Sequence, residues 1–163
     1  MTTVAPALAE ITGTYTIDPT HTRIGIVSRY AMVTKVRGAF NEFEGAAVLD
    51  GADPSRSTAS VTIQAASIDT RNAQRDEHLR NNDFLATDEF PTITFVSVTI
   101  PFSYEGGATD PFGNVRAGFE GSVAVSRKDF GITWNAALQT GGVLLGDKIV
   151  LEFEVSAIRN ASD

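Results

Sequence analysis

Apolar and polar residues alternate with a period of two along most of the chain, which is typical of β-strands with one buried face. In the last such segment Ile149, Leu151, Phe153 and Val155 alternate with Lys148 and with the residues between them. Further segments of this kind lie within residues 13–30, 32–50, 58–70, 90–100 and 119–138. Turn signals such as the DPFGN run at 110–114 separate them. Many short strands of this kind predict an antiparallel barrel or a sandwich, and barrel closure would remove exposed strand edges.

One polar segment interrupts the alternation. Residues 71–81, RNAQRDEHLRN, contain no proline, glycine or β-branched residue, so the sequence predicts a short helix there. Asp69 or Thr70 is the expected N-cap, because both side chains accept hydrogen bonds from free backbone N–H groups. The only apolar residues in this segment are Ala73 and Leu79, which predicts a weakly amphipathic helix on the protein surface.

Composition narrows the class of protein. A length of 163 residues fits one domain, which we place at residues 11–160 after a flexible arm at 1–10. The net charge of −7 argues against the sequence-independent phosphate binding of basic proteins, so no nucleic-acid partner is expected. The absence of cysteine excludes disulfides and thiolate chemistry. No stretch resembles a secretory signal or reaches the ~20 apolar residues of a membrane span. We therefore expect a soluble cytoplasmic protein without stable membrane insertion, and transient membrane contact stays open.

Five stretches of the chain resemble the YceI-like family of polyisoprenoid-binding proteins. They are IDPTHTRIGI, VRGAFNEFEG, IDTRNAQRDEHLRNNDF, FPTITFVS and RKDFGITWN, and they follow the family order over nearly the whole chain. The central block, with Arg75, Asp76, His78 and Phe84 in register, is the most specific. The resemblance implies a lipocalin-like antiparallel β-barrel of about eight strands or slightly fewer. It also implies a long isoprenoid chain inside, a polar or phosphorylated head group near the mouth, and no established catalytic reaction.

The chain departs from the family pattern at one place. Between the TFVS motif and the DPFGN turn the family carries a further strand pair, and here only VTIPFSYEGGAT stands between Ser97 and Asp110. About two strands of typical length are therefore missing. If the deletion is real, we expect a barrel that is open on one side or closed differently.

A barrel of eight strands is just wide enough for one slender ligand. The residues expected to line the tail are bulky and apolar, although any filled core would need the same residues. They are Ile24, Ile26, Phe40, Phe43, Ile63, Phe84, Phe95, Phe119 and Trp134.

The helix carries the candidate head-group site. Arg71 and Arg75 lie four residues apart and Arg75 and His78 three apart, so a helix would place them on one donor-rich stripe. His21, near a barrel end, is a further candidate for the head group. The alternative is a structural latch that includes Asp76 and Leu79. In it Asp76 and Glu77 neutralise the arginines, and His78 hydrogen-bonds to a backbone carbonyl and anchors the helix over the barrel end.

The remaining expectations concern chemistry and partners. His21 and His78 show no metal-site spacing, so no metal and no cofactor other than the isoprenoid ligand is expected. No GxSxG elbow or nucleotide fingerprint is present, and we expect a binding protein for lipid transport or storage, not an enzyme. A filled-core stress-response module and a hydrolase acting on an isoprenoid stay open as alternatives. Free strand edges at the deletion are compatible with a homodimer.

Overall fold

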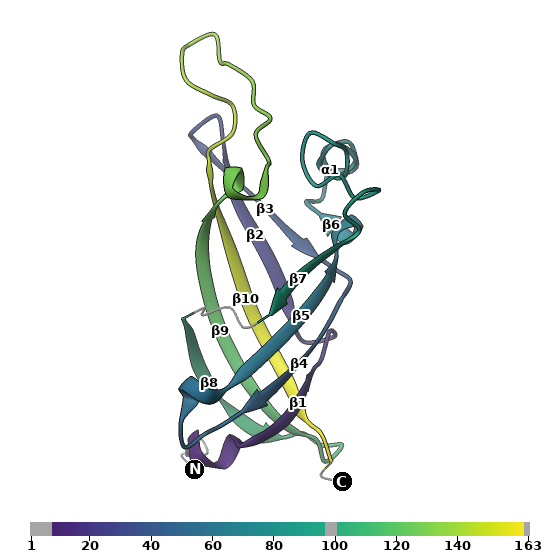
Figure 1. Ribbon diagram of the computed structural model, residues 1–163, viewed down its shortest axis with the longest axis vertical. Coiled ribbons are helices and arrows are strands. Elements are labelled where there is room, and N and C mark those ends of the chain that lie inside the picture. The colour runs from purple at the N-terminus through teal and green to yellow at the C-terminus, as the bar shows by residue number, and fades with distance from the viewer. Residues whose placement is uncertain (1–7, 97–100, 162–163) are drawn as a thin grey trace.

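The computed structural model describes residues 8–96 and 101–161, and in them an antiparallel sheet curls into an elongated barrel (Figure 1). This confirms the predicted fold class. The ten strands of the described part are β1 (Gly13–Ile17), β2 (Arg23–Tyr30), β3 (Thr34–Phe40), β4 (Phe43–Leu49), β5 (Thr58–Gln64), β6 (Ile68–Asp69), β7 (Thr92–Val96), β8 (Phe102–Thr109), β9 (Val115–Ser126) and β10 (Lys148–Arg159). The helix α1 (Ala73–Arg80) and the 3-10 turns η1 (Leu8–Ile11), η2 (Pro54–Arg56), η3 (Ala65–Ser67) and η4 (Arg127–Phe130) complete the fold.

Strand β10 is the centre of the sheet. One edge pairs with β9 from Lys148↔Ser126 to Ile158↔Arg116. The other edge pairs with β2 over residues 150–154 and with β1 over residues 157–159. Strands β1 and β2 therefore lie end to end and occupy one position in the sheet. In the same way β3 is followed by β4, and β5 by β6. Counted in this way, the ten described strands occupy seven positions across the sheet, which is close to the number of strands that the resemblance implies.

The sheet is not closed between β7 and β8. In the described residues β7 pairs only with β5, and β8 pairs only with β9. Among residues 8–96 and 101–161, the stretch of β9 beyond Gly121 pairs only with β10, since Gly121 is the last residue of β9 with a partner in β8. This opening lies in the part of the chain from which the sequence predicts that a strand pair is missing, and residues 97–100 of that part fall outside the described residues.

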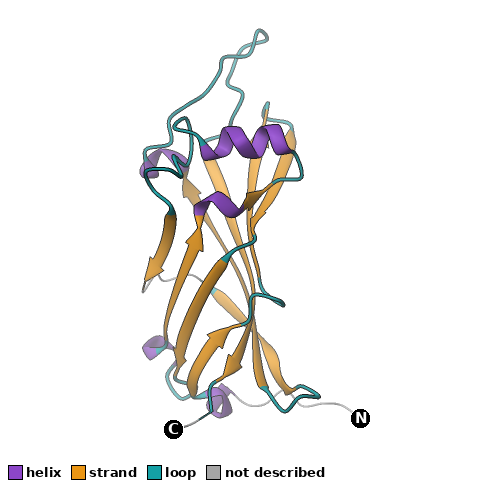
Figure 2. Cartoon of the chain, turned by 90° about the vertical axis from the view of Figure 1, so that its right-hand side faces the viewer, coloured by secondary structure: helices purple, strands orange, loops and turns teal. Residues whose placement is uncertain are grey.

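Helix α1 lies across the end of the barrel opposite the two termini (Figures 1 and 2). It is shorter than the predicted helix at 71–81, because Arg71 adopts a left-handed conformation with φ of 62° and stays outside it. The N-cap is Asn72, whose side-chain oxygen accepts a hydrogen bond from the Arg75 N–H at 2.9 Å, and not Asp69 or Thr70 as predicted. Asp69 instead accepts a hydrogen bond from the backbone N–H of Arg71 at 2.7 Å.

At the other end of the barrel lie the turn η1 and the end of β10 (Figure 1). The predicted flexible arm at residues 1–10 falls mostly outside the described residues, and from Leu8 the chain forms η1. No helix in the described ranges is long and apolar enough to cross a membrane.

Candidate functional site

An apolar column inside the barrel contains most of the predicted tail residues. Ile24, Phe40 and Ile63 are buried in one cluster with Ile68 and Phe153. Alternation explains this, because each of these side chains points to the inner face of its strand and the register aligns Phe153 with Ile24 and Ile24 with Phe40. The partly buried residues packed against this cluster are Ile26, Phe43, Val61, Leu79, Leu85, Ile93, Phe95, Val123, Leu151 and Val155.

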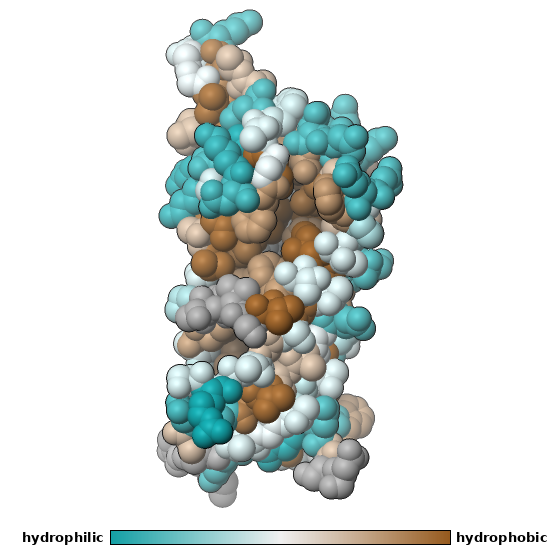
Figure 3. All heavy atoms as spheres, in the orientation of Figure 1, coloured by the Kyte–Doolittle hydropathy of each residue, from teal (hydrophilic) through white to brown (hydrophobic). Residues whose placement is uncertain are grey.

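A second, smaller cluster continues the column toward the termini. It consists of Tyr15, Ala117 and Ala157, against which the predicted tail residue Phe119 and the ring of Tyr104 pack. Phe119 is in register with Val155 of the first cluster, so the two clusters adjoin. Figure 3 shows brown, apolar residues in a hollow on the face between the β9 side and the β7 side, where the sheet is open. The inner surface of the barrel is thus apolar along its length and reachable at the opening.

Phe84 and Trp134 do not lie in this column. Their rings pack against each other and against His78, with ring centroids 4.9–5.3 Å apart. His78 belongs to α1, and Trp134 belongs to the long loop between β9 and β10. These three rings therefore join the helix to the loop at the end of the barrel that α1 covers.

The predicted stripe of donors on α1 is not formed. The Arg75 guanidinium donates through Nε to Thr70 Oγ1 at 2.7 Å and through a terminal nitrogen to the Thr70 carbonyl at 2.8 Å. Arg80 donates in the same way to the carbonyls of Ala66 and Ile68. Arg71 lies before the helix and is exposed. Two arginines thus hold the helix to the chain that precedes it.

Asp76 completes this set of contacts. It is buried, and its Oδ1 accepts hydrogen bonds from the Thr70 N–H at 2.9 Å and from the Thr70 hydroxyl at 2.5 Å. Leu79, on the same helix, packs against the first apolar cluster. Asp76 and Leu79 thus occupy positions at which they fix α1 to the end of the barrel.

The two histidines lie in different places. His78 Nε2 is 2.9 Å from Asp83 Oδ2 at the α1 end. His21 lies in the turn between β1 and β2, where its Nδ1 is 2.8 Å from Asp18 Oδ2 and its side chain is 64% exposed. The turn residue Asp18 also pairs with Arg116, which lies near the start of β9. This position places His21 away from the α1 end of the barrel.

An ion-pair network surrounds Arg116 on the outside of the barrel. Its guanidinium lies 2.6 Å from Asp18 and 2.8 Å from Asp110. The hydrogen bonds from Arg116 and then His21 hold the pKa of Asp18 well below its usual range. Hydrogen bonds from Asn114 and then Arg116 do the same for Asp110. The two carboxylates, Asp18 first, raise the pKa of Arg116 further. The network ties the β1–β2 turn to the β8–β9 turn.

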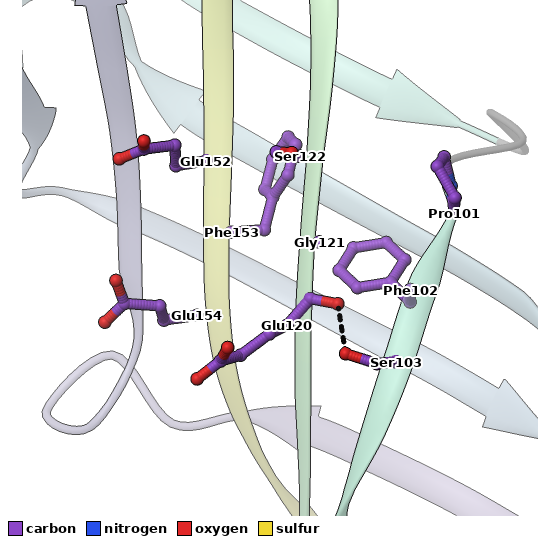
Figure 4. A pocket seen from close by; sticks show the side chains of 9 residues that line it. All are labelled: Pro101, Phe102, Ser103, Glu120, Gly121, Ser122, Glu152, Phe153 and Glu154. Carbon is purple, nitrogen blue, oxygen red and sulfur yellow. Dashed lines mark hydrogen bonds between the residues drawn. The ribbon is translucent and has the colours of Figure 1, made fainter.

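An acidic groove of about 640 Å³ lies on the outer face of β8, β9 and β10 (Figure 4). Glu152 and Glu154 alternate with the inward Phe153 and therefore point outward with Glu120. Arg23 lies 3.5 Å from Glu152 and 3.9 Å from Glu154, so part of this charge is balanced. This groove could not be predicted from the sequence, since its residues come from three strands. In the described ranges no group of three His, Cys, Asp or Glu side chains could hold a metal ion.

Comparison with known proteins points to one family. Residues 15–157 match the YceI-like domain. A UPF0312 protein of Staphylococcus aureus strain MSSA476 is 34% identical, and the match covers 88% of this chain and 95% of the relative. The match has 164 aligned positions but includes only 88% of the 163 residues of this chain, which is about 143 residues. The relative therefore has about 20 residues within the matched stretch that this chain lacks.

Solved structures share the fold. BcnA of Burkholderia cenocepacia has a TM-score of 0.69 at 21% identity, covering 86% of this chain and 98% of BcnA. A polyisoprenoid binding domain from Saccharophagus degradans, implicated in plant cell wall breakdown, has a TM-score of 0.62 at 10% identity, covering 90% and 98%.

Proposed function

Because this chain belongs to the YceI-like family, we propose that it binds a long isoprenoid lipid inside the barrel. The observation that carries the proposal is the continuous apolar column formed by the two clusters. A solved structure with the same fold, 10% identical, is described as a polyisoprenoid binding domain, which supports this ligand class. The further proposals are that the protein transports or stores the lipid in the cytoplasm, contacts membranes transiently and catalyses no reaction on the lipid.

The energetics favour a long, slim tail as the source of affinity. Burial of apolar groups contributes about 0.8 kcal/mol per CH₂, or about 4 kcal/mol per five-carbon unit. Four units would therefore offset the ~4–15 kcal/mol cost of association. The opening between β7 and β8 gives such a tail access to the column from the side of the barrel.

The alternative is a barrel filled by its own side chains. The rings of Phe95 and Phe153 contact each other inside the barrel with centroids 6.0 Å apart, as a filled core would require. In the isoprenoid proposal these rings move apart to admit the tail, or the tail lies along them at the opening. The two functions differ in whether a lipid accompanies the protein.

Organic extraction of freshly purified protein, followed by mass spectrometry, separates these functions. An isoprenoid or quinone at a stoichiometry near one per chain supports the proposal. A clean extract, together with no uptake of added isoprenoid, supports the filled core. Conversion of the bound lipid during incubation would instead indicate an enzyme. Sedimentation velocity on the same sample tests our proposal that free strand edges allow a homodimer.

A further inference from the structure

An exposed apolar tip projects from the end of the barrel that α1 covers. It is formed by the turn between β2 and β3, residues 30–33, and by residues 136–145 of the loop between η4 and β10. Met32 is 58% exposed and Val33 is 79% exposed, and Val143 of the loop is exposed as well. The loop extends farther from the barrel than α1 does (Figures 1 and 2), and Figure 3 shows brown, apolar residues on it. We call these two segments the apical tip.

Backbone hydrogen bonds join the two segments of the apical tip. The Ala31 N–H donates to the carbonyl of Leu144 at 2.6 Å, and Tyr30 forms an isolated antiparallel bridge with Leu145. Within the loop, the N–H of Leu144 donates to the carbonyl of Ala136 at 2.8 Å, so the loop itself folds back on itself. The turn is therefore held against the loop, and the apolar side chains of both segments belong to one surface.

The backbone of the turn is strained. Ala31 and Met32 have φ angles of 48° and 60°, in the left-handed region that favours glycine and asparagine. The Val33 N–H donates to the Tyr30 carbonyl at 3.1 Å and closes the turn around these two residues. An Asn-Gly pair would form such a turn without this strain but would offer no apolar side chain. Strained residues cluster at functional sites, which indicates that the turn does more than connect β2 to β3.

The charges beside the apical tip are mostly positive. Residues 130–146 contain no charged side chain. The exposed cations that flank the turn and the base of the loop are Arg29, Lys35, Lys128 and Lys148. Arg29 reaches the Val33 carbonyl at 3.5 Å and so lies at the turn itself. Residues 28–36 and 127–148 together hold five cations and two acids, a net charge of +3, although the whole chain carries −7. An anionic surface would therefore be attracted to this end of an acidic protein.

Helix α1 lies at the same end of the barrel and carries more acids than cations. Residues 71–90 contain three arginines and five acids. The helix is set back from the loop (Figures 1 and 2), so the apical tip would meet a flat surface first. Of these acids, buried Asp76 accepts hydrogen bonds from Thr70, and Asp83 lies 2.9 Å from His78. The acids of α1 therefore oppose an anionic surface less than the cations of the tip attract it.

We propose that the apical tip docks on the surface of an anionic membrane. Met32, Val33 and Val143 enter the boundary between head groups and acyl chains, and the flanking cations face the lipid phosphates. A bilayer is soft enough to receive two projecting turns, whereas a protein partner would need a site of complementary shape. This inference rests on the proposed function, for which it names the surface of membrane contact. Strand β9, which beyond Gly121 has no β8 partner among the described residues, leads to this end, so docking would bring the opening of the sheet near the bilayer.

Flotation of the full chain with lipid vesicles tests the docking. Vesicles of phosphatidylcholine alone are compared with vesicles that also contain phosphatidylglycerol, at low and at high salt. The variants are Val33→Asp, the pair Lys35→Gln with Lys128→Gln, and the pair Ala31→Asn with Met32→Gly. Phe112→Asp is the matched control, because Phe112 is 89% exposed in the β8–β9 turn, at the opposite end of the barrel, and the change in charge is the same. Since the chain itself has no cysteine, Val33→Cys can carry an environment-sensitive fluorophore at a single position.

We expect the wild type to float with the anionic vesicles at low salt and less at high salt, and the fluorophore emission to shift to the blue. Val33→Asp should lower the partition coefficient by about tenfold, because the burial of one valine side chain is lost, and Phe112→Asp should leave it unchanged. The two lysine substitutions should lower it by about 30-fold on anionic vesicles only. Ala31→Asn with Met32→Gly should bind more weakly but melt at the same temperature as the wild type or higher, which a damaged fold would not do.

Absence of the wild type from both kinds of floated vesicle would overturn the docking, and an isoprenoid in the organic extract of the same protein would leave the proposed function standing. Equal losses for Val33→Asp and Phe112→Asp would overturn the assignment of the contact to the apical tip. A dimer in sedimentation velocity that Val33→Asp dissociates, without flotation, would show that the tip binds a second copy instead. Flotation of a wild type that neither contains nor takes up an isoprenoid would support the docking and refute the proposed function.

Discussion

Replacement of Asp76 by alanine tests whether α1 is held on the barrel by the contacts described above. Asp76 is 6% exposed, and its carboxylate is the acceptor for both the N–H and the hydroxyl of Thr70. Arg75 donates to the same hydroxyl, so the three residues form one chain of hydrogen bonds. The substitution removes the last acceptor of this chain.

The magnitude follows from the two donors left without a partner. Each buried donor that loses its acceptor costs about 1–3 kcal/mol, so Asp76→Ala should lower the free energy of unfolding by roughly 2–6 kcal/mol. Asp76→Asn should cost less, because the amide oxygen still accepts a hydrogen bond from Thr70. Glu77→Ala is the matched control, since the neighbouring Glu77 is exposed and should change stability by less than about 0.5 kcal/mol.

Urea unfolding of the three variants measures these differences, with the slope of the transition checked for constancy. Amide hydrogen exchange then shows whether α1 opens before the barrel. We expect faster exchange in α1 of Asp76→Ala while the strands keep their protection. If Asp76→Ala were as stable as Glu77→Ala, the proposed anchoring of the helix would be wrong.

Three further variants test other parts of the structure. Folding lowers the pKa values of Asp18 and Asp110, so their pairing with Arg116 stabilises the protein fully above about pH 4 and is lost as they are protonated below that pH. Arg116→Gln should therefore be less stable than the wild type above about pH 4, and the difference should disappear at lower pH. Melting temperatures that run parallel to those of the wild type from about pH 2 to 7 would contradict this. Phe153→Ala should destabilise by about 3–5 kcal/mol in urea and abolish binding of phytane, the saturated hydrocarbon counterpart of a four-unit isoprenoid tail, whereas the 66% exposed Phe130→Ala should do neither. Arg127→Met should speed proteolysis within the loop at 131–147, because buried Arg127 donates to three backbone carbonyls there; an unchanged cleavage pattern would count against that role.

Much of the fold follows from local patterns. The alternation of Leu151, Phe153 and Val155 with polar neighbours gives both the strand and its inner face. Such alternation depends on residue spacing within one strand, which the sequence displays directly. The missing strand pair is inferred from the family resemblance and stays a prediction; among the described residues no pairing joins β7 to β8.

The polar contacts could not be read in this way. Arg75 has the spacing of a ligand-binding stripe, but its guanidinium reaches Thr70, and no pattern states which acceptor a long side chain will choose. Similarly, the two segments of the apical tip lie far apart in the chain. Their contact depends on the hydrogen bond from Ala31 to Leu144, which a single sequence does not specify.

The central claim is that the inner column of the barrel holds an isoprenoid tail, and photochemical labelling tests it most directly. A four-unit prenol carrying a diazirine near the end of its tail is bound, irradiated and mapped by peptide mass spectrometry. The account predicts labelled peptides from the inner faces of β2, β7 and β10, near Ile24, Phe95 and Phe153, with competition by phytane. Labelling confined to the outer groove around Glu120 and Glu152, or none that phytane displaces, would contradict it.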